Sequence, residues 1–212
     1  MSSINTIIFD LDGTLIDSAS SILAGFDYVL KINGISPLKR LTPSLIGPPL
    51  IPTIRMLSGI KEEKKLLEMA IEFKDYYDLK ACTLSQPFAG VIEGLNKLIK
   101  SKVDLHIATN KRYLPTLNIL KHLGWIDLFS SIYTLDKEGA NFHSKSDMIK
   151  NQLKDLELSY NQSIYVGDRV EDMEAADNNH LKFIGVSWGY GEFSKDVTII
   201  HSFGQLNELV AP

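Results

Sequence analysis

The sequence predicts an α/β fold in which a parallel β-sheet carries helices on both faces. Short apolar segments rich in β-branched residues alternate with segments whose apolar residues recur at helical spacing, and this alternation is typical of parallel sheets. Three apolar segments end at Asp10, Thr109 and Asp168. Because ligands of such sheets bind beyond the carboxyl ends of the strands, we expect these three side chains to lie at one edge of the sheet.

The first strand is expected at residues 6–9, an apolar segment followed directly by Asp10 and by the polar turn formed by residues 12–14. Its β-branched content indicates a buried strand. The other strands are expected at residues 103–108, 131–133, 163–166, 183–186 and 197–200. Helices between them are expected around residues 91–99, 117–123 and 148–153, with a last short helix around residues 206–210.

A helical insertion is expected after the first strand. Apolar residues at helical spacing from Ile22 to Leu30 predict one helix, which ends before Gly34, and residues 66–73 predict another. Between them, prolines prevent one long helix or a central strand. These prolines are Pro37, Pro43, Pro48, Pro49 and Pro52. We therefore expect two domains, with residues 1–15 and 83–212 forming the core and residues 16–82 forming the insertion.

Composition narrows the class of protein. The chain has 212 residues, a formal net charge of -4 and 44% hydrophobic residues, which is enough to bury a full core. The acidic balance gives no basic footprint, so no nucleic-acid partner is expected. No apolar segment approaches the ~20 residues that cross a bilayer, so no membrane association is expected.

The first residues of the chain and its cysteine content indicate a cellular location. The start of the chain lacks a basic region followed by an apolar stretch, which a secretory signal would have. Cys82 is the only cysteine, so no intrachain disulfide forms. A reducing, cytoplasmic location is therefore expected. A monomer and a homodimer are both left open.

The first strand is followed by two carboxylates, Asp10 and Asp12, two residues apart. Their repulsion is costly unless a cation, a hydrogen bond or a raised pKa relieves it. Gly13 permits a tight turn, and Thr14 adds a hydroxyl. The structural alternative is that Asp12-Gly13 is an ordinary turn and that Asp10 caps a helix.

A second pair, Asp168 and Asp172, lies four residues apart at an expected helix start and therefore on one helix face. An acidic first turn favoured by the helix dipole is the alternative. Together with Asp10 and Asp12 at the same sheet edge, a hard-cation site is the better interpretation, and carboxylates with backbone carbonyls suit Mg²⁺.

Lys145 is expected near the start of a helix, where a cation opposes the helix dipole. A role in binding negative charge is therefore expected, with a solvated surface lysine as the alternative. Thr109 ends a strand and precedes Asn110; its alternative role is that of a turn hydroxyl.

These segments resemble the four motifs of the haloacid dehalogenase superfamily. Residues 10–14 (Asp-Leu-Asp-Gly-Thr) resemble the first motif, Thr109 the second, Lys145 the third, and Gly167-Asp168 with Asp172 the fourth. The order and spacing match across the full chain. The resemblance implies a Rossmann-like core with a small helical cap inserted after the first strand.

Residues 46–50 (Ile-Gly-Pro-Pro-Leu), 167–169 and 188–191 (Trp-Gly-Tyr-Gly) are similar to segments of phosphoglycolate-phosphatase-like proteins, some of which are assigned as 5′-nucleotidases or pyrophosphatases. The resemblance therefore implies Mg²⁺-dependent hydrolysis of a small phosphorylated metabolite. Asp12 favours phosphate-ester chemistry over dehalogenation, because members built for dehalogenation lack this second carboxylate.

The resemblance also implies roles for the site residues. Asp10 attacks phosphorus and becomes an aspartyl-phosphate, and Asp12 acts as general acid and base. Mg²⁺ is held by Asp10, the backbone carbonyl of Asp12 and Asp168, with support from Asp172. Phosphoryl oxygens are bound by Lys145 and Thr109, with the turn at Gly13 and backbone N–H groups near Leu11 and Asn110 assisting.

Several alternatives stay open. The chain has Ser146 where many relatives carry proline after the lysine of the third motif, so Lys137 competes with Lys145 for that role. In the insertion, contact of Gly47, Arg40 or Arg55 with substrate is weighed against a packing or surface role. A 5′-nucleotidase and a β-phosphoglucomutase-type phosphoryl transfer are the alternative activities. A receiver-like signalling domain and an inactive binding protein are less favoured.

Overall fold

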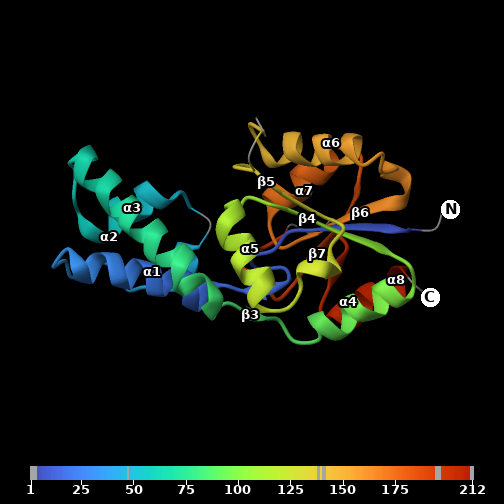
Figure 1. The fold of residues 1–212 in the computed structure, drawn as a ribbon, viewed down its shortest axis with the longest axis horizontal. Coiled ribbons are helices and arrows are strands. Elements are labelled where there is room, and N and C mark those ends of the chain that lie inside the picture. Colours follow the sequence, from blue (N-terminus) through green and yellow to red (C-terminus); the bar gives the residue numbers. More distant parts are fainter. Residues whose placement is uncertain (1–3, 47, 138, 140–141, 194–196, 211–212) are drawn as a thin grey trace. The chain divides into compact units, whose positions relative to one another are not determined.

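The computed structural model describes residues 4–46, 48–137, 139, 142–193 and 197–210 (Figure 1). The chain forms two compact units. One contains the chain up to Asp17 and again from Pro87, and the other spans Ser18–Gln86. The expected division at residues 16–82 lies close to these bounds. The short strands β2 (Ile16–Asp17) and β3 (Gln86–Pro87), which pair with each other, mark the two points where the chain passes between the units.

The first unit is built on a parallel sheet of six strands in the order β5-β4-β1-β6-β7-β8. The strands are β1 (Thr6–Phe9), β4 (Asp104–Thr109), β5 (Ser131–Thr134), β6 (Ser163–Gly167), β7 (Lys182–Val186) and β8 (Ile199–Ile200). The predicted α/β class is confirmed. The edge strand β8 is shorter than the expected segment 197–200, because only Ile199 and Ile200 pair with β7.

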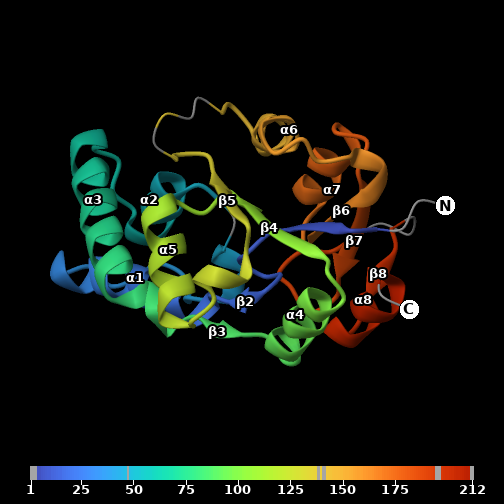
Figure 2. The ribbon, with the colours of Figure 1, turned by 45° about the vertical axis from the view of Figure 1, so that its right-hand side comes forward.

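Helices cover both faces of this sheet, as Figures 1 and 2 show. On one face lie α6 (Lys145–Asp155) and α7 (Val170–Asp177), whose apolar residues pack in one buried cluster with Ile8, Ala108 and Tyr165. On the other lie α4 (Val91–Lys100) and α8 (Phe203–Val210), where Phe203 stacks on Phe9 with 6.0 Å between ring centroids. Helix α5 (Tyr113–His122) connects β4 to β5.

The second unit is helical. It contains α1 (Ala19–Ile32), the short helix η1 (Pro43–Leu45), α2 (Leu50–Ser58), α3 (Glu63–Leu79) and the short helix η2 (Ala81–Leu84). The proline-rich stretch contains the short helices η1 and α2, in keeping with the expectation that its prolines prevent one long helix. Aromatic pairs join α1 to α3, with ring centroids 4.8 Å apart for Phe26–Phe73 and 3.9 Å apart for Tyr28–Tyr76. Helices α1 and α3 therefore pack on each other through aromatic side chains.

The strand order decides which residues meet at the carboxyl edge of the sheet. Strand β1 lies between β4 and β6, and Phe9 is in register with Ile107 and Val166. The residues that follow these three neighbouring strands are therefore brought together. Among the described residues, no helix is both long and apolar enough to span a membrane.

Helices α4 and α8 approach so closely that Gly94 has no room for a side chain. A Cβ at Gly94 would lie 2.0 Å from Cδ1 of Phe203, a residue that is itself buried against Phe9. We predict that Gly94→Ala destabilises the protein by about 1–3 kcal/mol through overpacking, although alanine is the better helix former. Urea unfolding measures this change.

Gly204→Ala, in α8, is the matched control, because a Cβ there would meet nothing closer than Ser202 Oγ at 3.8 Å. This control is expected to be neutral or slightly stabilising. Equal unfolding midpoints for the two variants would contradict the close packing of α4 on α8.

Candidate active site

The turn after β1 carries the first two carboxylates. The amide N–H of Asp10 donates to the carbonyl of Val166 at 2.9 Å, which extends the pairing of β1 with β6 by one residue. Gly13 has a φ of +83°, and a Cβ there would lie 2.3 Å from Oδ2 of Asp168. Glycine is therefore needed both for the turn and for the approach of Asp168 to it.

Lys145 contacts Asp10 from the start of helix α6. It is the first residue of α6, whose N-cap Ser144 accepts a hydrogen bond from the N–H of Asp147. Its Nζ lies 2.9 Å from Oδ1 of Asp10 and 2.5 Å from Oδ1 of Asp172. Lys137, by contrast, lies over the ring of Tyr133 at 4.5 Å from the centroid. The structure thus places Lys145 beside Asp10, whereas Lys137 lies beside Tyr133.

Asp172 links the backbone at Asp168 to the ammonium of Lys145. Its Oδ2 accepts the backbone N–H groups of Asp168 and Arg169, each at 3.1 Å, while its Oδ1 accepts from Lys145. Asp168 is fully buried, and its Oδ2 accepts the N–H of Tyr190 at 2.8 Å. Oδ1 of Asp168 is buried and has no hydrogen-bond partner within the described parts of the chain.

Asp12 has a partner that sequence reasoning missed. Lys111 donates to both carboxylate oxygens of Asp12, at 3.0 and 2.9 Å. Thr109 is buried at the end of β4, and its Oγ1 accepts the N–H of Lys111 at 3.3 Å, whereas the next residue, Asn110, is exposed. The signal for Lys111 was its position two residues beyond the end of a strand that neighbours β1.

The segment 188–191 packs directly on the site. The indole of Trp188 donates to the carbonyl of Thr14 at 3.0 Å, and the hydroxyl of Tyr190 donates to Asp17 at 2.8 Å. A Cβ at Gly189 would lie 2.2 Å from Cβ of Asp168. This loop therefore joins the turn after β1 to Asp168.

Burial and mutual repulsion perturb the charges of the site. Burial raises the pKa of Asp10 to about 7, and Lys145 only partly offsets this effect because Asp172 and Asp168 oppose it. Burial likewise raises the pKa of Asp168 to about 6, against the hydrogen bond from Tyr190. Burial alone would lower the pKa of Lys145, but Asp10 and Asp172 hold it well above its usual value. The single positive charge of Lys145 thus lies among three buried carboxylates, those of Asp10, Asp168 and Asp172.

This donor set fits a divalent cation. One carboxylate oxygen from each of Asp10, Asp168 and Asp172 lies within 4.8 Å of the others. The orphaned Oδ1 of Asp168 is a buried acceptor that needs a positive partner. Asp172 is already occupied by two N–H groups and by Lys145, which makes it a support for Asp168 rather than the main ligand. Oxygen ligands of this kind suit Mg²⁺.

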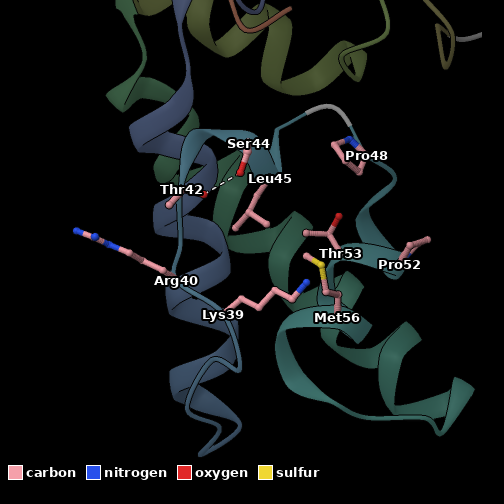
Figure 3. Close-up of a pocket in the computed structure, with 9 residues that line it drawn as sticks. All are labelled: Lys39, Arg40, Thr42, Ser44, Leu45, Pro48, Pro52, Thr53 and Met56. Atoms are coloured by element: carbon pink, nitrogen blue, oxygen red, sulfur yellow. Dashed lines mark hydrogen bonds between the residues drawn. The ribbon is translucent and has the colours of Figure 1, made fainter.

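The helical unit has a pocket of its own, with a volume of about 340 Å³. Figure 3 shows the amine of Lys39 directed into it and the side chain of Arg40 directed away. Its lining also includes Thr42, Ser44, Leu45, Thr53 and Met56. Arg55 forms an ion pair with Glu63. The remaining insertion residue of interest, Gly47, lies outside the described residues.

Residues 7–186 match the haloacid dehalogenase-like hydrolase family. The chain therefore belongs to this family, as the four motifs predicted. A haloacid dehalogenase-like hydrolase from Streptococcus pneumoniae has a similar structure, with a TM-score of 0.83 at 28% identity over 99% of both chains.

Three curated relatives illustrate which members of the family this chain is similar to. The tyrosine-protein kinase PtkA of Mycobacterium tuberculosis is 31% identical over 87% of this chain. A 5′-nucleotidase of Pseudomonas aeruginosa is 29% identical over 87% of this chain and 83% of its own length. A phosphoglycolate phosphatase of Rhodobacter capsulatus is 29% identical over 96% of this chain and 95% of its own length. The chain spans only 62% of the length of PtkA.

The raised pKa values of Asp10 and Asp168 predict that the metal-free site stabilises the fold less as pH rises. Both Asp10 and Asp168 have folded-state pKa values above the ordinary 3.8. Their contribution to stability is therefore fully present below about pH 4 and is lost as pH rises through about 6 to 7. With EDTA present, we expect the stability of the wild type relative to Asp10→Asn to fall across this window, measured by urea unfolding.

Added Mg²⁺ favours the ionised carboxylates, so its stabilising effect on the wild type should grow over the same pH range. Asp177→Asn, at an exposed position in α7, is the control. A wild type that gains stability relative to Asp10→Asn as pH rises, in the absence of metal, would contradict the charge imbalance.

Proposed function

We propose that the chain is a Mg²⁺-dependent phosphatase that hydrolyses a small phosphomonoester through an aspartyl-phosphate on Asp10. The observation that carries this proposal is the 2.9 Å contact between Asp10 and Lys145 beside the unpartnered Oδ1 of Asp168. A carboxylate that must approach an anionic phosphate needs such an electropositive setting.

In the first step, a carboxylate oxygen of Asp10 forms a bond to phosphorus as the ester P–O bond breaks. The leaving oxygen takes a proton from the carboxyl group of Asp12, which acts as general acid. Asp12 suits this role because it follows Asp10 by two residues and its side chain is 21% exposed. A substrate oxygen can therefore reach it.

In the second step, the Asp12 carboxylate takes a proton from a water molecule whose oxygen attacks phosphorus. The bond between phosphorus and Asp10 then breaks and releases inorganic phosphate. Both carboxylates return to their initial states, so the cycle is balanced.

The phosphoryl oxygens are bound by groups around the end of β1 and β4. Lys145 supplies a buried ammonium, and Thr109 supplies a hydroxyl at the end of the neighbouring strand. Backbone N–H groups of Leu11 and Asn110, together with the turn at Gly13, complete the cradle. Each donor favours the charge that the phosphoryl group carries during transfer.

Asp10, Asp168 and the backbone carbonyl of Asp12 would hold Mg²⁺, with Asp172 supporting Asp168 and Lys145. When bound, the ion supplies positive charge that offsets the repulsion between Asp10 and the phosphate. Oxygen donors with no soft ligand among them favour this hard cation over zinc or copper.

We further propose that the helical unit Ser18–Gln86 is the cap of this site and excludes water from it. The substrate is a small phosphorylated metabolite, and a cytoplasmic location accords with the single cysteine. Phosphoglycolate, a nucleoside monophosphate and a sugar phosphate are the substrate classes to compare, in line with the relatives that are named phosphoglycolate phosphatase and 5′-nucleotidase.

A panel of these phosphomonoesters, assayed with Mg²⁺ and with EDTA, tests the activity. We predict phosphate release that requires the metal and that is abolished in Asp10→Asn, because an amide cannot act as the nucleophile. Thermal melting should show that Asp10→Asn folds, and Asp177→Asn, at its exposed position in α7, should retain full activity.

The same panel separates hydrolysis from the competing activities. Isomerisation of a sugar phosphate without phosphate release would indicate a mutase. Transfer of phosphate from ATP to a tyrosine peptide, without hydrolysis of any ester in the panel, would replace the proposal with the activity for which PtkA is named.

Asp12→Asn tests the general acid. We predict a loss of about 10²–10⁴-fold in kcat/KM for an alkyl phosphate, because an alkoxide leaves poorly without a proton. The variant should still be phosphorylated by p-nitrophenyl phosphate, and the phosphoenzyme should then accumulate because its hydrolysis lacks a base. Rapid steady-state phosphate release by this variant would remove Asp12 from its role.

A further inference from the structure

Lys111 and Asp12 form an ion pair for which the four motifs provide no role. The Lys111 ammonium contacts both oxygens of the carboxylate, at 3.0 and 2.9 Å. The side chain of Lys111 is only 5% exposed, whereas that of Asp12 is 21% exposed. Lys111 therefore contacts Asp12 from within the protein, while part of the Asp12 side chain stays accessible to solvent.

The fold explains why these two residues meet. Strands β1 and β4 are parallel neighbours, and Phe9 is in register with Ile107. Asp12 lies three residues beyond the end of β1, and Lys111 lies two residues beyond the end of β4. The backbone of Lys111 is itself anchored, because its N–H donates to Oγ1 of Thr109. The ion pair is thus built entirely within the sheet-containing unit.

The Asp12 carboxylate relies on one lysine, as that of Asp10 does on Lys145, whereas Asp168 and Asp172 also accept backbone N–H groups. The Asp172 carboxylate accepts from two backbone N–H groups as well as from Lys145, and Asp168 accepts a backbone N–H. Through the described parts of the chain, the Asp12 carboxylate has Lys111 as its only hydrogen-bond donor. Without Lys111, rotation of the Asp12 side chain would be restrained by its packing alone.

We propose that Lys111 is a positioning residue that orients the Asp12 carboxylate toward the leaving-group oxygen. This inference rests on the proposed phosphatase activity, in which Asp12 exchanges protons with that oxygen and with water. General acid catalysis requires a heavy-atom distance of about 2.6–3.2 Å to the oxygen that receives the proton. A misplacement of about 1 Å costs on the order of 10²-fold in rate.

Leaving-group dependence tests this role. For Lys111→Met we expect kcat/KM on an alkyl phosphate such as ethyl phosphate to fall by about 10²-fold. For p-nitrophenyl phosphate, whose leaving group needs little protonation, we expect a fall of less than about threefold, because kcat/KM then reports a step that hardly uses the acid. Lys111→Arg should recover part of the alkyl phosphate activity, since it keeps the charge and the donors.

A double-mutant cycle supplies the second readout. In the Asp12→Asn background, Lys111→Met should have almost no further effect on ethyl phosphate, because no acid remains to be oriented. Lys182→Met, which removes an exposed lysine at the start of β7, is the matched control and should leave both substrates unaffected. Lys111→Gln repeats the series if Lys111→Met fails to fold.

Three results would overturn the positioning role. One is an equal fall in kcat/KM for both substrates, and another is a rise in KM at unchanged kcat, which would mark Lys111 as a contact for the substrate. The third is a full Lys111→Met effect in the Asp12→Asn background. A wild type that hydrolyses neither these two esters nor any member of the phosphomonoester panel would instead refute the proposed function, so the two failures are distinguishable.

Discussion

The structure depends on how three buried carboxylates are kept together at the edge of the sheet. Asp10, Asp168 and Asp172 converge on a region where one ammonium, that of Lys145, contacts two of them at 2.9 and 2.5 Å. Burial raises the pKa values of Asp10 and Asp168, and the repulsion among three carboxylates that share one ammonium adds to this rise. The remaining negative charge favours a further cation at this site.

The parallel sheet is what makes this crowding geometrically possible. Strand β1 lies between β4 and β6, so the segments that follow all three strands leave the sheet side by side. The site is then reinforced from two further directions. Helix α6 delivers Lys145 from its first turn, and the loop 188–191 binds the turn after β1 through Trp188 and Asp168 through Tyr190. A rigid core thereby orients short side chains whose own freedom is small.

Much of this arrangement was predictable because it follows from local patterns. Asp10, Thr109 and Asp168 each follow or end a strand whose apolar, β-branched residues are visible in the sequence, and parallel strands share one functional edge. The loop 188–191 was not recognised as part of the site, because its role depends on contacts with residues such as Thr14 that are about 170 positions away. Lys111 was missed because the charge of a single lysine near a strand end is most often solvated.

By itself, the sequence determined the α/β class, the helical insertion and the identity of the acidic residues, because periodicity and turn chemistry act over a few neighbouring residues. Only the tertiary structure decided which lysine serves which carboxylate. It placed Lys145 on Asp10, Lys111 on Asp12 and Lys137 over the ring of Tyr133. Such pairings depend on strand order and helix placement, which bring together residues separated by up to 135 positions. No local propensity specifies those distances.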